Sequence, residues 1–217
     1  MFMRLKQKIL RFALRSLLPS WAPLEQVIKV HVNDPQRSQI LHMINENRSL
    51  FQEVRGSTNN HQAWPGGWSD HYADGMNLAV VLYTVLDCLR PLPFSLHDVL
   101  VSFFAHDIEK PWKYDYDAST GEWNHKANFV TKEDANNFRI KKLEEYGIVL
   151  TPMQLNGMEY AEGEVGKLYS NRERKSSPLA SVVHAVDGLS ARLWYDCPYQ
   201  ENDPWSGAFR VQSINKP

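Results

Sequence analysis

Apolar residues recur three and four positions apart over most of the chain, the spacing typical of helices with one buried face. This pattern predicts helices over residues 35–54, 69–89 and 95–110, the last of them ended by Pro111. No stretch longer than a few residues alternates with a period of two, and only the aromatic segment 112–128 leaves room for a short hairpin, around Ser119-Thr120-Gly121. The pattern predicts an all-α fold.

Three more helices are indicated by the residues that would begin them. Thr131 precedes Lys132-Glu133-Asp134, which resembles a capping box with aspartate in place of glutamate. Thr151–Pro152 and Ser177–Pro178 each combine a capping hydroxyl with proline at the first helical position. We therefore expect helices to start at these three points.

The first 18 residues read as a basic amphipathic helix that ends before Pro19. The first 24 residues carry a net charge of +5, and the remainder carries −6. Such a helix would dock on the domain or on a second copy of the chain in a homo-oligomer, or attach weakly to an anionic membrane surface. We accordingly divide the chain into this helix, 1–22, and a single helical domain, 23–217.

The composition excludes several classes of protein. The formal net charge is −1, which gives no sign of binding to double-stranded nucleic acid. The two cysteines, Cys88 and Cys197, stand far apart and form no CxxC motif, which argues against a disulfide framework or a thiolate zinc site and fits the cytoplasm. No uninterrupted apolar run approaches the ~20 residues of a membrane-spanning helix.

The segment Phe103-Phe104-Ala105-His106-Asp107-Ile108-Glu109-Lys110 carries the strongest chemical signal. An apolar helix ends there in an adjacent imidazole and carboxylate, which together suit a divalent cation such as Zn, Mn, Fe or Co. A solvated pair at a helix end would have the same sequence. The dipeptide His97–Asp98 is interpreted as an accidental match near a helix N-terminus.

Two distant segments strengthen the signal. Upstream, Gly66 and Gly67 lead into a helix with His71 in its first turn, and Asp74 follows on the same face. Downstream, Asp187 lies among core valines, where a carboxylate without a partner would be costly. A metal ion is one such partner, and an ion pair with Arg192 is the alternative.

These segments resemble the motifs of the HD superfamily of metal-dependent phosphohydrolases. "HQAWPGGWSDH" looks like the "H-x-x-x-x-G-G-L-L-E-H" lead-in of its exoribonuclease-like branch, "HDIEK" is similar to "HDIGK", and "VVHAVDGLSAR" is similar to the final "H-x-x-D" helix. The likeness covers residues 61–194 and implies an HD-type helical bundle. It also implies that the metal ligands are His71, His106, Asp107 and Asp187, and that Lys110 lies near the substrate phosphate.

The chain departs from the family pattern at two places. Glu109 stands where the family usually has glycine. Binuclear members have further histidines between the doublet and the final "H-x-x-D" motif, where this chain has only His125. Glu162 would replace such a histidine at a second metal, and a mononuclear site is the alternative.

The resemblance implies hydrolysis of a phosphoester or phosphoanhydride bond with a divalent ion (Mn, Fe, Co, Zn or Mg). Asp107 and Lys110 would be catalytic; Arg174, His61 and Asp74 would bind the substrate or orient the site. The expected substrate is small and phosphorylated, most plausibly a nucleotide. The alternatives are a 3′–5′ exonuclease acting on single-stranded RNA or DNA, and a non-catalytic sensor or scaffold that contains a metal. Four aromatic residues would either line a base-stacking pocket or pack in the core, namely Trp64, Trp68, Trp112 and Tyr160.

Overall fold

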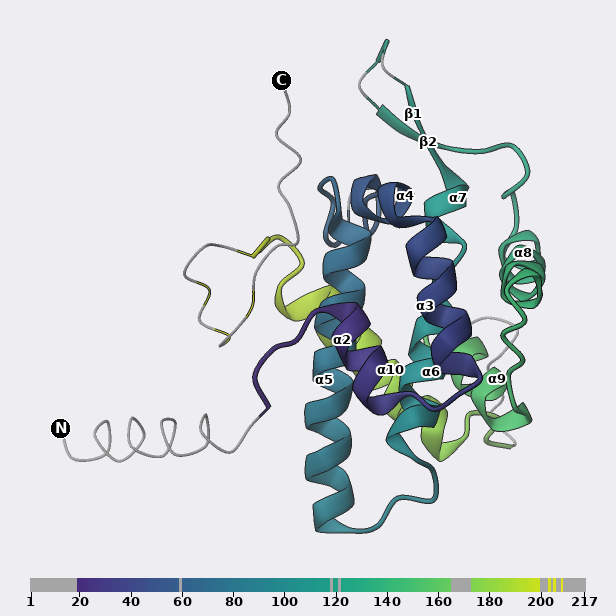
Figure 1. Cartoon of the computed structure of the whole chain (residues 1–217). Coiled ribbons are helices and arrows are strands. Elements are labelled where there is room, and N and C mark those ends of the chain that lie inside the picture. The colour runs from purple at the N-terminus through teal and green to yellow at the C-terminus, as the bar shows by residue number, and fades with distance from the viewer. Residues whose placement is uncertain are drawn as a thin grey trace, which may run out of the picture.

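The computed structural model describes residues 19–58, 60–117, 119–120, 122–164, 173–199, 203, 205 and 208. The predicted helix over residues 1–18 lies outside this part of the chain. Within it, the helices are α2 (Leu24–His31), α3 (Gln36–Glu46), α4 (Arg48–Glu53), α5 (Gly67–Leu89), α6 (Leu96–His106), α7 (Lys110–Lys113), α8 (Lys132–Glu145), α9 (Pro152–Glu159) and α10 (Pro178–Leu193) (Figure 1). The fold is therefore mostly helical, as predicted.

The β element in the described part of the chain is a hairpin that projects from the helical body (Figure 1). Strands β1 (Tyr114–Asp117) and β2 (Glu122–His125) pair antiparallel, with Tyr114 opposite His125 and Asp117 opposite Glu122. The turn includes Ser119 and Thr120, within the segment where the sequence left room for a hairpin. The chain is thus not entirely α-helical.

Helix starts were predicted better than helix ends. Ser95, Thr131 and Thr151 each form a capping box, with Asp98, Asp134 and Gln154 respectively. Ser177 accepts a hydrogen bond from the Ala180 amide at the start of α10. Since Asp98 belongs to the cap of α6, the dipeptide His97–Asp98 has a structural role, which agrees with its interpretation as an accidental match.

Two predicted helices end earlier than the sequence indicated. The helix predicted over 35–54 is split at Asn47, whose side-chain amide donates to the Met43 carbonyl and to the Tyr146 hydroxyl. An asparagine that bonds locally in this way competes with the helical ladder. The helix predicted over 95–110 ends at His106, and Pro111 lies in the first turn of α7, where its missing N–H is not needed. The short helix α2 was not predicted.

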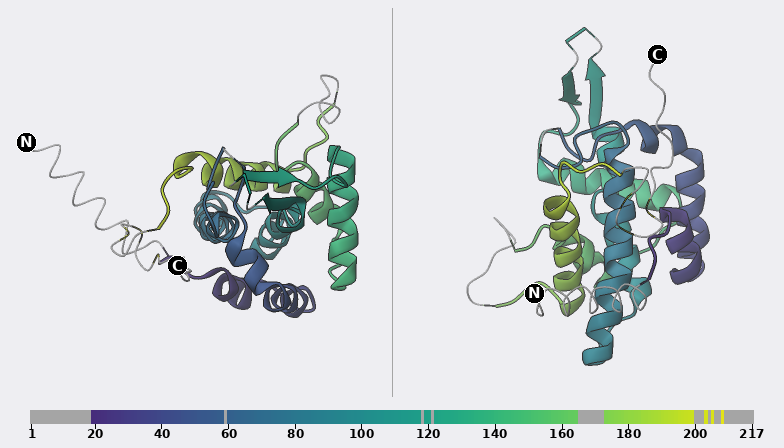
Figure 2. Two further views of the ribbon diagram at one scale, coloured as in Figure 1. Left: turned by 90° about the horizontal axis from the view of Figure 1, so that it is seen from above. Right: turned by 90° about the vertical axis from the view of Figure 1, so that its left-hand side faces the viewer.

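The core brings α5, α6 and α10 together. Gly75 on α5 faces the ring of Phe103 on α6 so closely that a Cβ atom would lie 2.0 Å from that ring. The two helices therefore approach more closely than larger side chains would allow. Trp68, Tyr72 and Phe104 are fully buried beside this contact, and α10 packs against both helices. Figure 2 shows this central group from two further directions.

Helix α5 has the length and composition of a membrane-spanning helix, with 23 residues and a mean hydropathy of 1.2 in its most apolar window. Its first half also carries Asp70, His71 and Asp74, all of them buried by the surrounding helices. Buried polar side chains of this kind are typical of a core helix that contributes to a site. We therefore treat α5 as the central helix of the bundle.

Candidate metal centre

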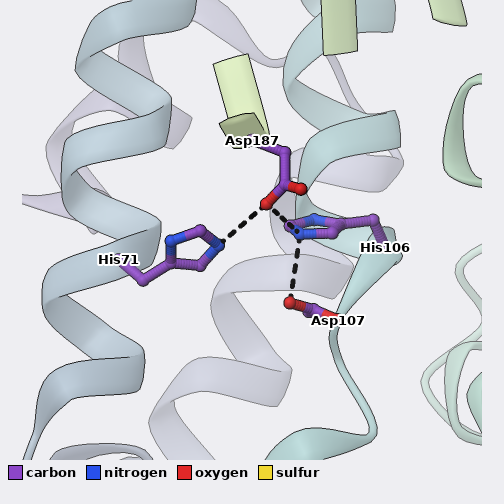
Figure 3. Close-up of side chains that lie close together, drawn as sticks. All are labelled: His71, His106, Asp107 and Asp187. Carbon is purple, nitrogen blue, oxygen red and sulfur yellow. Dashed lines mark ion pairs between the residues drawn. The ribbon is translucent and has the colours of Figure 1, made fainter. Parts of the chain in front are cut away.

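Four side chains from three separate segments meet inside the bundle. His71 comes from the first turns of α5, His106 is the last residue of α6, Asp107 follows it, and Asp187 comes from α10 (Figure 3). One ligand atom from each lies within 4.8 Å of the others. These are the four residues that the sequence resemblance named, and together they could hold a metal ion.

The Asp187 carboxylate lies between the two histidines. Its Oδ1 atom is 3.3 Å from Nε2 of His71 and 3.2 Å from Nε2 of His106 (Figure 3). Asp107 Oδ2 lies 3.2 Å from the same His106 nitrogen. Arg192, the alternative partner for Asp187, is exposed instead.

Both histidines present an Nε2 atom that makes no hydrogen bond. Nδ1 of His106 lies 2.5 Å from the Phe103 carbonyl, and an acceptor there requires the ring proton to be on Nδ1. The Ser190 hydroxyl donates to the His71 carbonyl at 3.1 Å. Its proton is used in that bond, so the same hydroxyl accepts from Nδ1 of His71 at 3.0 Å. The two Nε2 atoms are buried without a hydrogen-bond partner. Two imidazole nitrogens that face one carboxylate oxygen, and that are free of protons once an ion is bound, are what a divalent ion requires.

The spacing of these atoms also fits one ion. With metal–ligand bonds of about 2.1 Å, neighbouring ligand atoms lie about 3.0 Å apart in an octahedral site and about 3.4 Å apart in a tetrahedral one. The three closest separations, of 3.2 and 3.3 Å, lie between those values, and all four ligand atoms lie within 4.8 Å of one another. A set of two imidazoles and two carboxylates suits Mn, Fe, Co or Zn better than the all-oxygen shell preferred by Mg and Ca.

The pKa values reflect strong coupling within the cluster. Burial lowers the pKa of His71, which is fully enclosed. Burial also opposes a charge on His106, but the carboxylates of Asp107 and Asp187 outweigh it and raise the pKa of His106 to about 10. Burial would raise the pKa of Asp187, yet the two imidazoles hold the pKa of this carboxyl below its usual range. Without an ion, the cluster keeps one proton on His106.

Binding of a cation should therefore release that proton. Because the proton competes with the ion up to a pKa of about 10, affinity for Mn²⁺ should rise about tenfold per pH unit from about pH 6 to about pH 8. Calorimetric titration in two buffers with different ionisation enthalpies measures the number of protons released, and we expect about one per ion. A binding constant that does not change with pH would contradict this protonation scheme.

Two further predicted residues lie beside the cluster. Lys110 forms an ion pair with Asp107, and that carboxylate raises the pKa of the lysine against the effect of burial. The His61 ring lies 5.1 Å from the His71 ring, centroid to centroid. Burial, with Lys110 and His71 adding to it, lowers the pKa of His61 to about 4, so this imidazole is neutral at pH 7.

A hydrogen-bond chain fixes the orientation of His61. The amide nitrogen of Gln62 donates to the Ser190 carbonyl at 2.9 Å, which leaves the amide oxygen to accept from Nδ1 of His61 at 2.7 Å. Nε2 of His61 is then the acceptor nitrogen of the ring. His61 can therefore accept a hydrogen bond from a molecule bound at the cluster.

Three predicted residues have other roles in the structure. The buried carboxylate of Asp74 accepts a hydrogen bond from the Tyr199 hydroxyl, and burial raises its pKa to about 7. Glu162 is exposed and pairs with Lys132 at 2.8 Å, so it is not a second metal ligand at this cluster. Arg174 is exposed and acts electrostatically on Glu164, whose pKa is lowered mainly by the hydrogen bond from the Ser176 hydroxyl. The expected substrate and second-metal roles of these residues find no support in their contacts.

Most of the aromatic residues considered for a base-stacking pocket pack against other parts of the protein. Trp68 is fully buried, and its indole N–H donates to the Asp107 carbonyl at 3.2 Å. Trp64 donates to Asp70 at 2.6 Å, and Tyr160 is buried. A separate cavity of about 80 Å³ is lined by Trp68 together with Trp21, Phe51 and Tyr199, and the four ligand residues do not line it. The packing interpretation of the aromatic residues therefore agrees with the structure better than a base-stacking pocket.

Sequence reasoning missed Ser190, which sets the tautomer of His71. Ser190 follows Asp187 by three residues on α10, a spacing that places two side chains on one helix face. A Ser190→Ala variant should bind Mn²⁺ about tenfold more weakly, because the His71 ring loses its orienting partner. Ser181→Ala, which removes an exposed hydroxyl from the same helix, is the matched control and should bind like the wild type. Equal affinities for all three proteins in calorimetric titration would contradict this role.

Comparisons with known proteins add no further constraint on the site. No family model, no curated protein and no solved structure matches this chain.

Proposed function

We propose that this protein is a metal-dependent phosphohydrolase of the HD type, acting on a small phosphorylated substrate that is most plausibly a nucleotide. The observation that carries the proposal is the pair of buried Nε2 atoms of His71 and His106, which lack hydrogen-bond partners and face a shared Asp187 oxygen. Buried polar atoms normally find partners, and a divalent ion supplies one here.

The order of the ligands along the chain supports the HD assignment. A histidine at the start of one helix, a His–Asp doublet at the end of the next, and an aspartate within the last helix meet at one point. A bound divalent ion would polarise a phosphoryl oxygen and lower the pKa of a water molecule. The chain itself contributes the residues that hold the ion and those that receive the substrate.

The exposure of the cluster favours approach of the substrate from one side. The side chains of His71 and His106 are 0% and 2% exposed, whereas those of Asp187 and Lys110 are 18% and 13% exposed. Lys110 is thus within reach of a phosphate on the accessible side, where its charge can stabilise developing negative charge. The neutral ring of His61 can accept a hydrogen bond from a substrate hydroxyl or from the attacking water.

Charge favours a small substrate over a polymer. A long single strand would require a basic groove along its backbone, and the chain beyond residue 24 carries a net charge of −6. We expect purified protein with Mn²⁺ to hydrolyse a nucleotide or a model phosphoester in a panel of small substrates, with a rate that depends weakly on salt. Exonuclease action would instead fall steeply with salt, because each contacted phosphate releases counterions.

The panel also distinguishes the alternatives. Degradation of single-stranded oligonucleotides without activity on nucleotides would favour the exonuclease. Tight metal binding without turnover on either class would favour a sensor or scaffold. A wild-type protein that binds no divalent metal would contradict all three.

A further inference from the structure

The turn between α6 and α7 carries two residues of the proposed site, Asp107 and Lys110. Its backbone is tied to α5 through the Asp107 carbonyl, which accepts from the Trp68 indole at 3.2 Å and from the Lys110 amide at 3.2 Å. Ile108 is fully buried in the core. These contacts fix two points of the turn, and the orientation of the Asp107 carboxylate depends on how firmly the rest is held.

The third point of attachment is Glu109. Its backbone begins α7, where its carbonyl accepts from the amides of Trp112 and Lys113 at 3.0 Å each. Its side chain points to α8 and meets Arg139, with Nε 3.1 Å from Oε2. The Glu109 side chain is only 4% exposed and that of Arg139 is 14% exposed, so the ion pair is largely shielded from water.

Burial of the Glu109 carboxylate carries a free-energy cost. An unpaired carboxylate in the core carries a large desolvation penalty, and even a well-made buried pair is often no more stabilising than apolar residues of similar size. Such a pair fixes the orientation of two segments relative to each other, because the two charged groups must keep a defined geometry. Glu109 therefore ties the ligand-bearing turn to α8, which stands at one edge of the bundle (Figures 1 and 2).

The charge of Arg139 also reaches the cluster. Both Asp107 and Glu109 act electrostatically on its guanidinium. Lys110 pairs with Asp107 directly. Asp107 is thus held in the field of two cations from different helices. Among the described residues, Arg139 makes its hydrogen bond and ion pair with Glu109 and not with His71, His106 or Asp187, so its influence should reach the site through the turn.

We propose that Arg139 and Glu109 are positioning residues for the metal site, and that their ion pair aligns Asp107 and Lys110 from α8. This inference rests on the proposed metal function. Helix α8 would then help to position the ligands of the proposed metal site, although α8 carries none of these ligands itself. Partners that orient a ligand typically alter metal affinity 10–100-fold when they are removed.

The test compares metal affinity with stability in four full-length variants stripped of metal by a chelator. They are Arg139→Met, Glu109→Met, the double variant, and Lys132→Met as a control, which breaks an exposed ion pair on the same helix. Calorimetric titration measures affinity for Mn²⁺, and thermal unfolding measures Tm. Each single variant leaves one buried charge unpaired and should lower Tm, whereas the double variant removes both charges and should recover it.

We expect the double variant to regain a Tm near that of the wild type and still to bind Mn²⁺ about 10–100-fold more weakly, while Lys132→Met binds normally. Affinity that returns to the wild-type value together with Tm would overturn the inference, because the pair would then serve stability alone. If the singles are too unstable to titrate, the double variant alone decides between these results. A wild-type protein with no affinity for Mn²⁺ would overturn the proposed function instead, and this inference with it.

Discussion

An Asp187→Asn protein should fold, contain no metal above background, and have no measurable phosphohydrolase activity. Asp187 is the residue that joins the cluster, because one of its oxygens lies within 3.3 Å of both histidine Nε2 atoms. Asparagine keeps the size of the side chain but removes the charge that holds a cation beside them. The loss of metal and the loss of turnover should therefore occur together. Elemental analysis of the purified protein measures the first, and the substrate panel measures the second.

Asp74→Asn is the matched control for this substitution. It also removes a buried carboxylate, but one that accepts a hydrogen bond from Tyr199, and the asparagine oxygen can still accept that bond. We expect metal content and turnover to remain at the wild-type level. A normal metal content in Asp187→Asn would rule out the four-residue site, and a loss of metal in Asp74→Asn would return Asp74 to the functional residues.

The four residues of the cluster could be predicted from the sequence because each stands out locally. His106 and Asp107 end an apolar helix, Asp187 interrupts a run of core valines, and two glycines precede the helix that carries His71. A polar residue at a position where the helical pattern requires an apolar one can be recognised from the sequence alone. The resemblance then supplied the order in which these residues belong together.

The contacts that orient the ligands could not be predicted in the same way. Ser190 and Arg139 are ordinary residues on helical surfaces until packing places Ser190 against His71 and Arg139 against Glu109. Their partners are 119 and 30 residues away in the sequence. Periodicity identifies the buried face of a helix, but not the side chain that the face will meet.

Two predicted residues have partners away from the cluster for a geometric reason. Asp74 follows His71 by three positions, which places it about 60° around the helix, and this rotation is enough to direct it to Tyr199. Glu162 lies beyond α9, which ends at Glu159, and the next residue, Gly163, takes a left-handed backbone with φ of 85°. Beyond the helix end, Glu162 faces solvent and pairs with Lys132.

Lys110→Met should lose catalysis while keeping its metal. The lysine is not one of the four ligand residues, and its contact with the cluster is an ion pair with the Asp107 carboxylate. In the proposed reaction its charge stabilises the phosphoryl oxygens as negative charge develops. Loss of one positioned group of this kind typically lowers kcat about 10²–10³-fold. Steady-state kinetics on the best substrate of the panel measures this change, and elemental analysis measures the metal.

Lys113→Met provides the comparison, since Lys113 lies on the same short helix with its ammonium over the Tyr114 ring, 5.9 Å from the ring centroid. We expect its kcat to stay within about twofold of the wild type, because its half-buried ammonium contacts the Tyr114 ring and none of the four residues of the cluster. If Lys110→Met loses its metal as well, the lysine acts through Asp107 as a support for the ligand. If both kcat and metal content are unchanged, Lys110 does not contact the transition state, and the charge that stabilises the phosphate must come from the ion alone.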